Sequence, residues 1–170
     1  MNAAPAIAAP TETREIALAD EAATARLADL VAGAARPRDV IALTGPLGVG
    51  KTAFARGFIA ALARRRGAPP PPEVPSPTFT LVQTYALGGA SVWHFDLYRL
   101  ARPDDAVELG LDEALAEGIS LIEWPERLGR LLPRDRLEIA LAYDAEDRPQ
   151  ARRARLAGHG AWAGRIHDVA

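Results

Sequence analysis

The sequence predicts an α/β fold, with a largely parallel central sheet, flanking antiparallel strands and helices on both faces. Short apolar runs alternate with amphipathic segments through the first two-thirds of the chain, which is typical of parallel strands joined by crossover helices. Two pairs of strand-like runs, each pair joined by a turn-forming segment, predict antiparallel hairpins. We therefore expect an α/β sheet with antiparallel additions.

The first strand and helix are predicted from local signals. Residues 13–18 are expected to form an edge strand. Asp20 is a favoured N-cap residue type, and a helix is predicted from there to about Ala35. Its predicted buried face consists of apolar residues at helical spacing: Leu27, Leu30, Val31 and Ala34.

A buried strand and a second helix follow. Residues 39–43 form a short apolar run that fits a parallel strand, and a glycine-rich loop leads from it into a helix ending near Arg66. Phe54, Phe58 and Leu62 recur at i, i+4 and i+8, which predicts the core-facing stripe of this helix. Gly67 and the four prolines at 69–72 end the helix and predict a stiff connector.

The rest of the chain predicts two hairpins, a buried strand and further helices. The expected elements are a hairpin of 80–87 and 91–96 around Gly88-Gly89, an acidic helical stretch over 103–117, a strand over 119–124, a hairpin of 133–143 and 150–158, and a helix over 161–169. We expect these elements to form one domain over residues 14–170, after a disordered tail of residues 1–13.

Composition excludes several classes of function. The chain has 170 residues, which suits one domain, and its net charge of −2 gives no sign of an extended nucleic-acid or membrane surface. It has no cysteine, which excludes disulfides, thiolate zinc sites and cysteine nucleophiles. No apolar run approaches the roughly 20 residues that span a bilayer, and the N-terminus does not resemble a signal peptide. We expect a cytoplasmic protein without a membrane partner.

Residues 45–52 match the phosphate-binding pattern G-x-x-x-x-G-K-[ST]. An apolar strand precedes them and an amphipathic helix begins inside them, which is the context that the pattern requires. Backbone N–H groups of such a loop converge on an anion, and the helix N-terminus adds partial positive charge. Lys51, the only lysine among 20 basic residues, should reach the β- and γ-phosphates of a nucleotide, and the Thr52 hydroxyl should bind Mg²⁺. The alternative is a chance glycine-rich turn.

Two acids follow apolar strands, where ligands of parallel sheets bind. Asp96 is our candidate for the acid that holds Mg²⁺; alternatively it pairs with Arg99 or caps a turn. Glu123 is a candidate metal ligand through water, or the base that orients the attacking water. A purely structural role for Glu123 stays open. Trp124, directly after it, is expected to be a packing residue.

Three further side chains are candidates for a role in the site, each with a structural alternative. Residues 76–80 carry hydroxyls on a loop where a γ-phosphate sensor is expected, through Thr78 or Thr80; a turn held by local hydrogen bonds is the alternative. Strand alternation places His94 on the same face as Asp96. Its role is either structural or that of a proton shuttle.

Four segments together resemble one family, the bacterial TsaE (YjeE) P-loop ATPases of tRNA threonylcarbamoyladenosine biosynthesis. These segments are residues 45–52, 76–82, 94–100 and 122–126, and the resemblance extends over about 20–143. It implies a P-loop NTPase-type fold and slow Mg²⁺-dependent ATP hydrolysis, stimulated by the TsaD–TsaB complex that transfers the threonylcarbamoyl group to tRNA. Contact with tRNA would be indirect, through that complex.

The resemblance also assigns roles to single residues. The residues expected to bind the nucleotide are Glu21, Gly48, Val49, Gly50, Lys51, Thr52 and Ala53. The residues expected in catalysis are Asp96, Glu123 and Thr78, and those around the metal are Thr52, Asp96 and Glu123. One departure is visible: the prolines at 69–72 lengthen the connector before Ser76, which leaves the position of the switch-like loop open.

Three other functions are alternatives to an ATPase for a chain with this phosphate-binding loop. A GTPase usually needs Asn-Lys-x-Asp, and this motif is impossible because Asn2 is the only asparagine and Lys51 is the only lysine. A small-molecule kinase needs an acceptor pocket and an arginine-bearing lid, for which the arginines after Gly129 are a weak candidate. A nucleotide-gated binding module overlaps with the favoured function.

Overall fold

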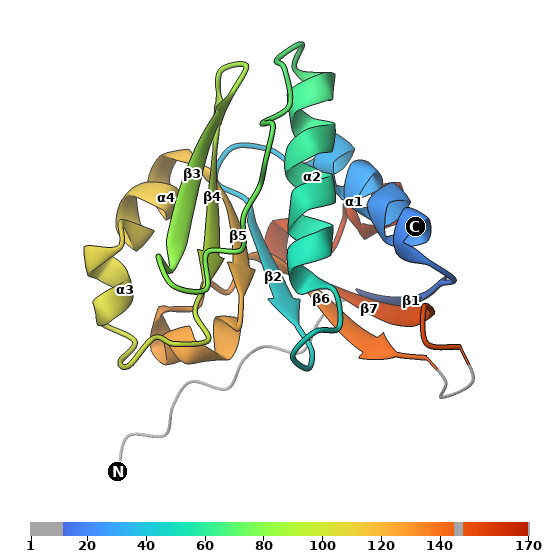
Figure 1. The fold of residues 1–170 in the computed structure, drawn as a ribbon. Coiled ribbons are helices and arrows are strands. Elements are labelled where there is room, and N and C mark those ends of the chain that lie inside the picture. The colour runs from blue at the N-terminus through green and yellow to red at the C-terminus, as the bar shows by residue number, and fades with distance from the viewer. Residues whose placement is uncertain (1–11, 145–147, 170) are drawn as a thin grey trace.

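A computed structural model of the chain describes residues 12–144 and 148–169. Its sheet is formed by β1 (Glu12–Leu18), β2 (Val40–Thr44), β3 (Val82–Leu87), β4 (Ala90–Asp96), β5 (Ile119–Glu123), β6 (Arg136–Tyr143) and β7 (Arg152–His159). The strand order is β1-β7-β6-β2-β5-β4-β3 (Figure 1). The four central strands are parallel, and β1, β7 and β3 pair antiparallel at the flanks. The predicted fold class is confirmed.

The strands at the centre of the sheet are buried on both faces. All five residues of β5 and the first four of β2 are buried, which explains why these segments are continuous apolar runs. The predicted β3–β4 hairpin is present, and Gly88 and Gly89 have φ values of 55° and 83° at its turn. Two successive residues with positive φ are the geometry that a tight hairpin requires, and glycine adopts it without strain.

Helices α1 (Glu21–Ala34) and α2 (Lys51–Arg65) lie side by side over one face of the sheet (Figure 1). Asp20 caps α1, because its Oδ1 accepts a hydrogen bond of 2.7 Å from the Ala23 backbone N–H. Phe54, Phe58 and Leu62 of α2 are buried as predicted. The predicted face of α1 is wrong at Leu30, which is 45% exposed because α1 instead turns Ala28 and Ala32 inward, where small residues let it approach α2.

A second apolar core lies on the opposite face. Phe95 and Ile122 point into it from the sheet, and Leu111 and Leu128 close it from α4 (Leu111–Glu117) and the 3₁₀ segment Pro125–Leu131. The predicted helical stretch 103–117 is two short helices, α3 (Asp105–Glu108) and α4. Gly110 separates them with a φ of 88°, and a Cβ there would lie 2.8 Å from the Trp93 ring.

The two ends of the chain differ from the predictions. The predicted helix over 161–169 is two short 3₁₀ turns, Gly160–Trp162 and Ile166–Val169, because Gly164 disfavours a continuous helix and packing holds each turn separately. Residues 1–11 of the predicted tail lie outside the described residues, and the tail boundary is wrong because Glu12 and Thr13 belong to β1. Within 12–144 and 148–169, no helix is long and apolar enough to cross a membrane.

Candidate active site

The glycine-rich loop joins β2 to α2 at the carboxyl end of the parallel strands. Gly45, Gly48 and Gly50 all have positive φ, at 132°, 77° and 119°. A Cβ on Gly45 would overlap the carbonyl oxygen of Leu141, so this position needs glycine for space as well as for conformation. No side chain of the described residues caps the N-terminus of α2, where the N–H groups of the first turn can bind an anion.

Lys51 lies at the start of α2, 4% exposed. Its Nζ donates hydrogen bonds to the carbonyl oxygens of Gly45 and Pro46, at 2.7 and 2.9 Å, and lies 4.1 Å from the centroid of the Trp124 ring. Burial lowers the pKa of Lys51, and the carboxylates of Glu123 and Asp96 oppose that shift. The ammonium group is therefore held inside the loop, against the two predicted acids.

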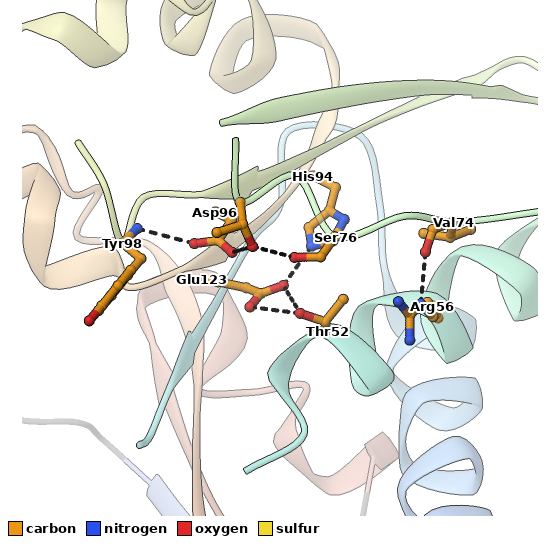
Figure 2. Close-up of polar contacts among 9 residues, drawn as sticks. Thr52, Arg56, Val74, Ser76, His94, Asp96, Tyr98 and Glu123 are labelled. Carbon is orange, nitrogen blue, oxygen red and sulfur yellow. Dashed lines mark hydrogen bonds and ion pairs between the residues drawn. The ribbon is translucent and has the colours of Figure 1, made fainter. Parts of the chain in front are cut away.

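Asp96 and Glu123 are neighbours at the ends of β4 and β5, where they are direct register partners. Both side chains are buried. The Thr52 hydroxyl lies 3.0 and 3.1 Å from the two carboxylate oxygens of Glu123, and Nε2 of His94 lies 2.8 Å from Oε1 (Figure 2). The strand-end acids predicted from sequence are thus brought together with the predicted Mg²⁺ ligand Thr52.

The loop after the proline connector reaches the same site. The Thr78 hydroxyl donates a hydrogen bond of 3.0 Å to Oδ2 of Asp96, and the Ser76 hydroxyl lies 2.6 Å from that of Thr78. The Tyr98 backbone N–H donates to Oδ1 of Asp96 at 3.1 Å (Figure 2). Asp96 is therefore held from both sides. Of the two alternative roles for it, the turn cap is present in the Tyr98 contact, whereas Arg99 is not among its contacts within the described residues.

Arg56 fixes the end of the proline-rich connector that precedes Ser76. This residue lies on α2, one turn beyond Thr52, and its Nε donates a hydrogen bond of 2.7 Å to the carbonyl oxygen of Val74 (Figure 2). The Val74 side chain packs into the main apolar core. The chain is thus fixed two residues before Ser76, whatever the length of the proline segment.

Two cavities open on either side of the glycine-rich loop. The first, of about 300 Å³, is lined by Leu47, Gly48, Gly50, Lys51, Thr52, Ala53, Ser76, Thr78, Asp96, Tyr98, Glu123 and Trp124. The second, of about 200 Å³, is lined by Glu21, Thr24, Gly48, Val49, Gly50, Ala53, Gln150 and Arg152. Every residue to which the family resemblance assigns a role lines one of these two cavities, whereas Thr80, the other candidate γ-phosphate sensor, lines neither.

The donors of the first cavity suit a hard cation. The carboxylates of Asp96 and Glu123 and the hydroxyls of Thr52, Ser76 and Thr78 line it, and Lys51 is the only basic residue in its lining among the described residues. The Thr52 proton can point to Glu123 while the oxygen lone pairs stay available to Mg²⁺. Within the described part of the chain no cluster of three or more His, Asp or Glu side chains is arranged to hold a metal unaided. Mg²⁺ takes few carboxylates in proteins and fills its shell with phosphate oxygens and water.

Sequence reasoning missed some of the lining. Trp124 packs against the second apolar core as predicted, but it also lies over the Lys51 ammonium group and 4.9 Å from the Tyr98 ring centroid, and both aromatic rings line the first cavity. Its backbone has a φ of 58°, which is unusual for a residue with a side chain.

Comparison with known proteins decides the family. Residues 18–154 match the family model described as "Threonylcarbamoyl adenosine biosynthesis protein TsaE". The chain belongs to the TsaE family. A TsaE protein of Rickettsia felis is 40% identical over 124 residues, which cover 73% of this chain and 70% of the relative. A TsaE protein of Bacillus subtilis is 38% identical over 125 residues, which cover 73% of this chain and 74% of the relative.

The fold is also similar to a solved structure. The crystal structure of YdiB from Bacillus subtilis superposes with a TM-score of 0.73 at 28% sequence identity, over 93% of this chain and 94% of YdiB. The resemblance noted in the sequence is thereby confirmed at the level of family and fold. The TsaE relatives are named for tRNA threonylcarbamoyladenosine biosynthesis. As a member of the family, this chain has a role in that biosynthesis.

Proposed function

We propose that this chain binds ATP with Mg²⁺, hydrolyses it slowly and supports the TsaD–TsaB complex in threonylcarbamoylation of adenosine in tRNA. The observation that carries the proposal is the contact between the Thr52 hydroxyl and the Glu123 carboxylate, beside the glycine-rich loop. Phosphate binding alone needs only the loop and Lys51. A buried carboxylate at the metal-binding hydroxyl adds the group that hydrolysis requires.

Each residue then has a separate task. The loop N–H groups and Lys51 hold the phosphates. The Lys51 ammonium then binds phosphate oxygens in place of the Gly45 and Pro46 carbonyls. Thr52 and Asp96 supply oxygen ligands for Mg²⁺, which when bound neutralises charge on the phosphate oxygens. Glu123 orients the attacking water and accepts its proton. Thr78, hydrogen-bonded to Asp96, senses the γ-phosphate.

The second cavity suits the nucleoside end of ATP. It adjoins the first across the same loop, and Glu21 and Thr24 of α1 face the loop there. In the proposed pose the phosphates occupy the first cavity and the base and ribose occupy the second. The proposed role of Glu21 is thus a contact with the nucleoside, away from the reacting phosphate.

The kinase alternative has less support. Its candidate lid was the arginines after Gly129, but no arginine lines the first cavity. Arg130 instead forms an exposed ion pair with Asp104 at 3.1 Å. Water is therefore the favoured acceptor of the phosphoryl group.

Stimulation by a partner agrees with the open mouth of the site. Leu47 lines the first cavity at 69% exposure, and Phe79, next to Thr78 in the chain, is 83% exposed. Large apolar side chains at such positions favour contact with another protein. Exclusion of water by that contact would strengthen the electrostatic interactions inside the site and so raise the rate.

Phosphate release tests the proposal. The purified protein should hydrolyse ATP slowly with Mg²⁺, and the rate should rise about tenfold or more when TsaD, TsaB and tRNA are added, within the range that completing an active site provides. A pull-down of the TsaD–TsaB complex should give different yields in ATP and in ADP. Faster phosphate transfer to a metabolite than to water would favour the kinase instead. A rate of ATP hydrolysis that does not change when TsaD, TsaB and tRNA are added would refute the proposed partnership.

A further inference from the structure

We propose that His94 is a positioning residue for Glu123, and that its Nε2–H group holds the Glu123 carboxylate against Thr52. The proposal rests on the ATPase function proposed above and adds a residue to which no catalytic role has been assigned. Its evidence is a buried hydrogen bond between two neighbouring strands. Its consequence is that the proposed water-orienting group is fixed before ATP binds.

The sheet brings the two side chains together. Alternation along β4 puts His94 on the face covered by α2, together with Val92 and Asp96. In the parallel pairing His94 is the partner of Leu121, and Glu123 follows two residues later on the same face of β5. The Glu123 side chain reaches back along the sheet, so that its Oε1 lies 2.8 Å from Nε2 of His94 (Figure 2).

Counting protons assigns the donor. Glu123 is 2% exposed, and its ionised carboxylate can only accept hydrogen bonds, so each side chain bound to it must supply a proton. The Thr52 hydroxyl contacts both oxygens, but it carries one proton and can donate to only one of them at a time. Lys51 donates to the Gly45 and Pro46 carbonyls. The second proton at Glu123 therefore comes from His94, which must carry its hydrogen on Nε2.

A packing role alone does not account for a histidine here. The His94 side chain is fully buried, and its Nδ1 has no hydrogen-bond partner within the described residues. Burial of an unpaired nitrogen costs stability, whereas an apolar side chain of similar size would fill the same space without that cost. What the histidine adds is the Nε2 contact with Glu123.

Two amide variants separate positioning from packing. In His94→Gln the side-chain amide nitrogen can occupy the place of Nε2, whereas in His94→Asn it reaches only the place of Nδ1. Both replace an aromatic ring by a smaller polar amide, so their effects on folding should be similar. We expect His94→Asn to lower kcat about 10- to 100-fold with little change in KM for ATP, since one hydrogen bond to a charged group is lost. His94→Gln should keep at least about a third of the wild-type kcat, because it retains that bond.

A spectroscopic measurement reads the contact without ATP. In ¹⁵N-labelled protein without nucleotide, His94 should carry a slowly exchanging proton on Nε2, and Glu123→Ala should abolish that protection. An Nδ1–H tautomer, or equal loss of kcat in the Gln and Asn variants, would overturn the proposal. If the wild-type protein proves inactive even with the TsaD–TsaB complex, the proposed function fails, and the tautomer and its response to Glu123→Ala still decide whether His94 holds Glu123.

Discussion

At the scale of single residues, the site depends on buried charges whose partners come from distant parts of the chain. Lys51 is bound by carbonyl groups of its own loop and covered by Trp124, and Glu123 is bound by Thr52 and His94. Such groups lose hydration on folding and depend on a few specific contacts. Their substitution should therefore change function more than stability.

Lys51→Met tests this distinction. The variant should bind ATP about 10- to 100-fold more weakly, because charge-assisted hydrogen bonds to phosphate are lost. Its free energy of unfolding near pH 7 should not fall. The lowered pKa of Lys51 means that folding disfavours the charged form, so the penalty is present below the folded-state pKa and is relieved as the pH rises through it.

Calorimetric titration with ATP and denaturant unfolding measure the two effects. Arg64→Ala is a matched control, because Arg64 is an exposed cation on the same helix, and its guanidinium pairs with Asp29 at 3.8 Å, away from the glycine-rich loop. Unchanged ATP affinity in Lys51→Met would remove Lys51 from the phosphate site.

Sequence predicted most of the chemical groups but not all of their contacts. The spacing of 45–52 identified Lys51 and Thr52, and the apolar runs before Asp96 and Glu123 marked both acids, because strand ends are visible in hydrophobic pattern. The His94–Glu123 contact depends on the register of β4 against β5, which a single sequence does not specify. The position of Trp124 over Lys51 depends on a left-handed backbone that no local signal required.

At the scale of elements, the connector between α2 and β3 carries the loop that contacts Asp96. Arg56 ties this connector to α2 at the Val74 carbonyl, and Leu81, with a φ of 67°, turns the chain from the loop into β3. The Leu81 N–H donates to the Pro77 carbonyl at 2.6 Å and closes that turn. Thr78 is thus placed by contacts on both sides of it.

Arg56→Ala should loosen the loop and lower the rate of ATP hydrolysis about 3- to 10-fold, as expected for loss of one hydrogen bond. The test is a double-mutant cycle with Thr78→Ala. If Arg56 acts by placing Thr78, Arg56→Ala should have little further effect once Thr78 is already truncated. Additive losses would show that Arg56 acts elsewhere, and Arg64→Ala should leave the rate unchanged.

The errors in the predicted elements have a common cause. The single helix over 103–117 and the buried position of Leu30 were predicted from local sequence. The helix is broken at Gly110, which fits against Trp93 of β4, and smaller residues of α1 are buried in place of Leu30. The 3₁₀ turns at the C-terminus replace a helix for the same kind of reason, since Trp162 and Ile166 pack separately. In each case tertiary packing outweighs a weak local preference.

At the scale of the whole molecule, parallel strands place the functional groups on one rim. The carboxyl ends of β2, β4 and β5 supply the glycine-rich loop, Asp96 and Glu123, as expected for a parallel sheet. The segment after residue 154 lies outside the family match, yet Trp162 and Val169 are buried in the main core. Arg165 also pairs with Asp39 at 2.6 Å, next to the start of β2. The parallel centre was predictable from apolar runs, whereas the seven-strand order was not, because it depends on long-range pairing.

The central claim is that this rim is one Mg²⁺-dependent ATP-hydrolysing site. The measurement that tests it most directly is phosphate release as a function of Mg²⁺, with the TsaD–TsaB complex and tRNA present, for the wild type and Asp96→Asn. The substitution keeps the size of the side chain and one acceptor oxygen, but it replaces the other oxygen by an amide NH2 and removes the charge beside Thr78 and Tyr98. We expect the variant to stay folded and to lose about 100-fold or more of its Mg²⁺-dependent rate, as expected when electrostatic stabilisation is removed. Undiminished turnover would contradict the account.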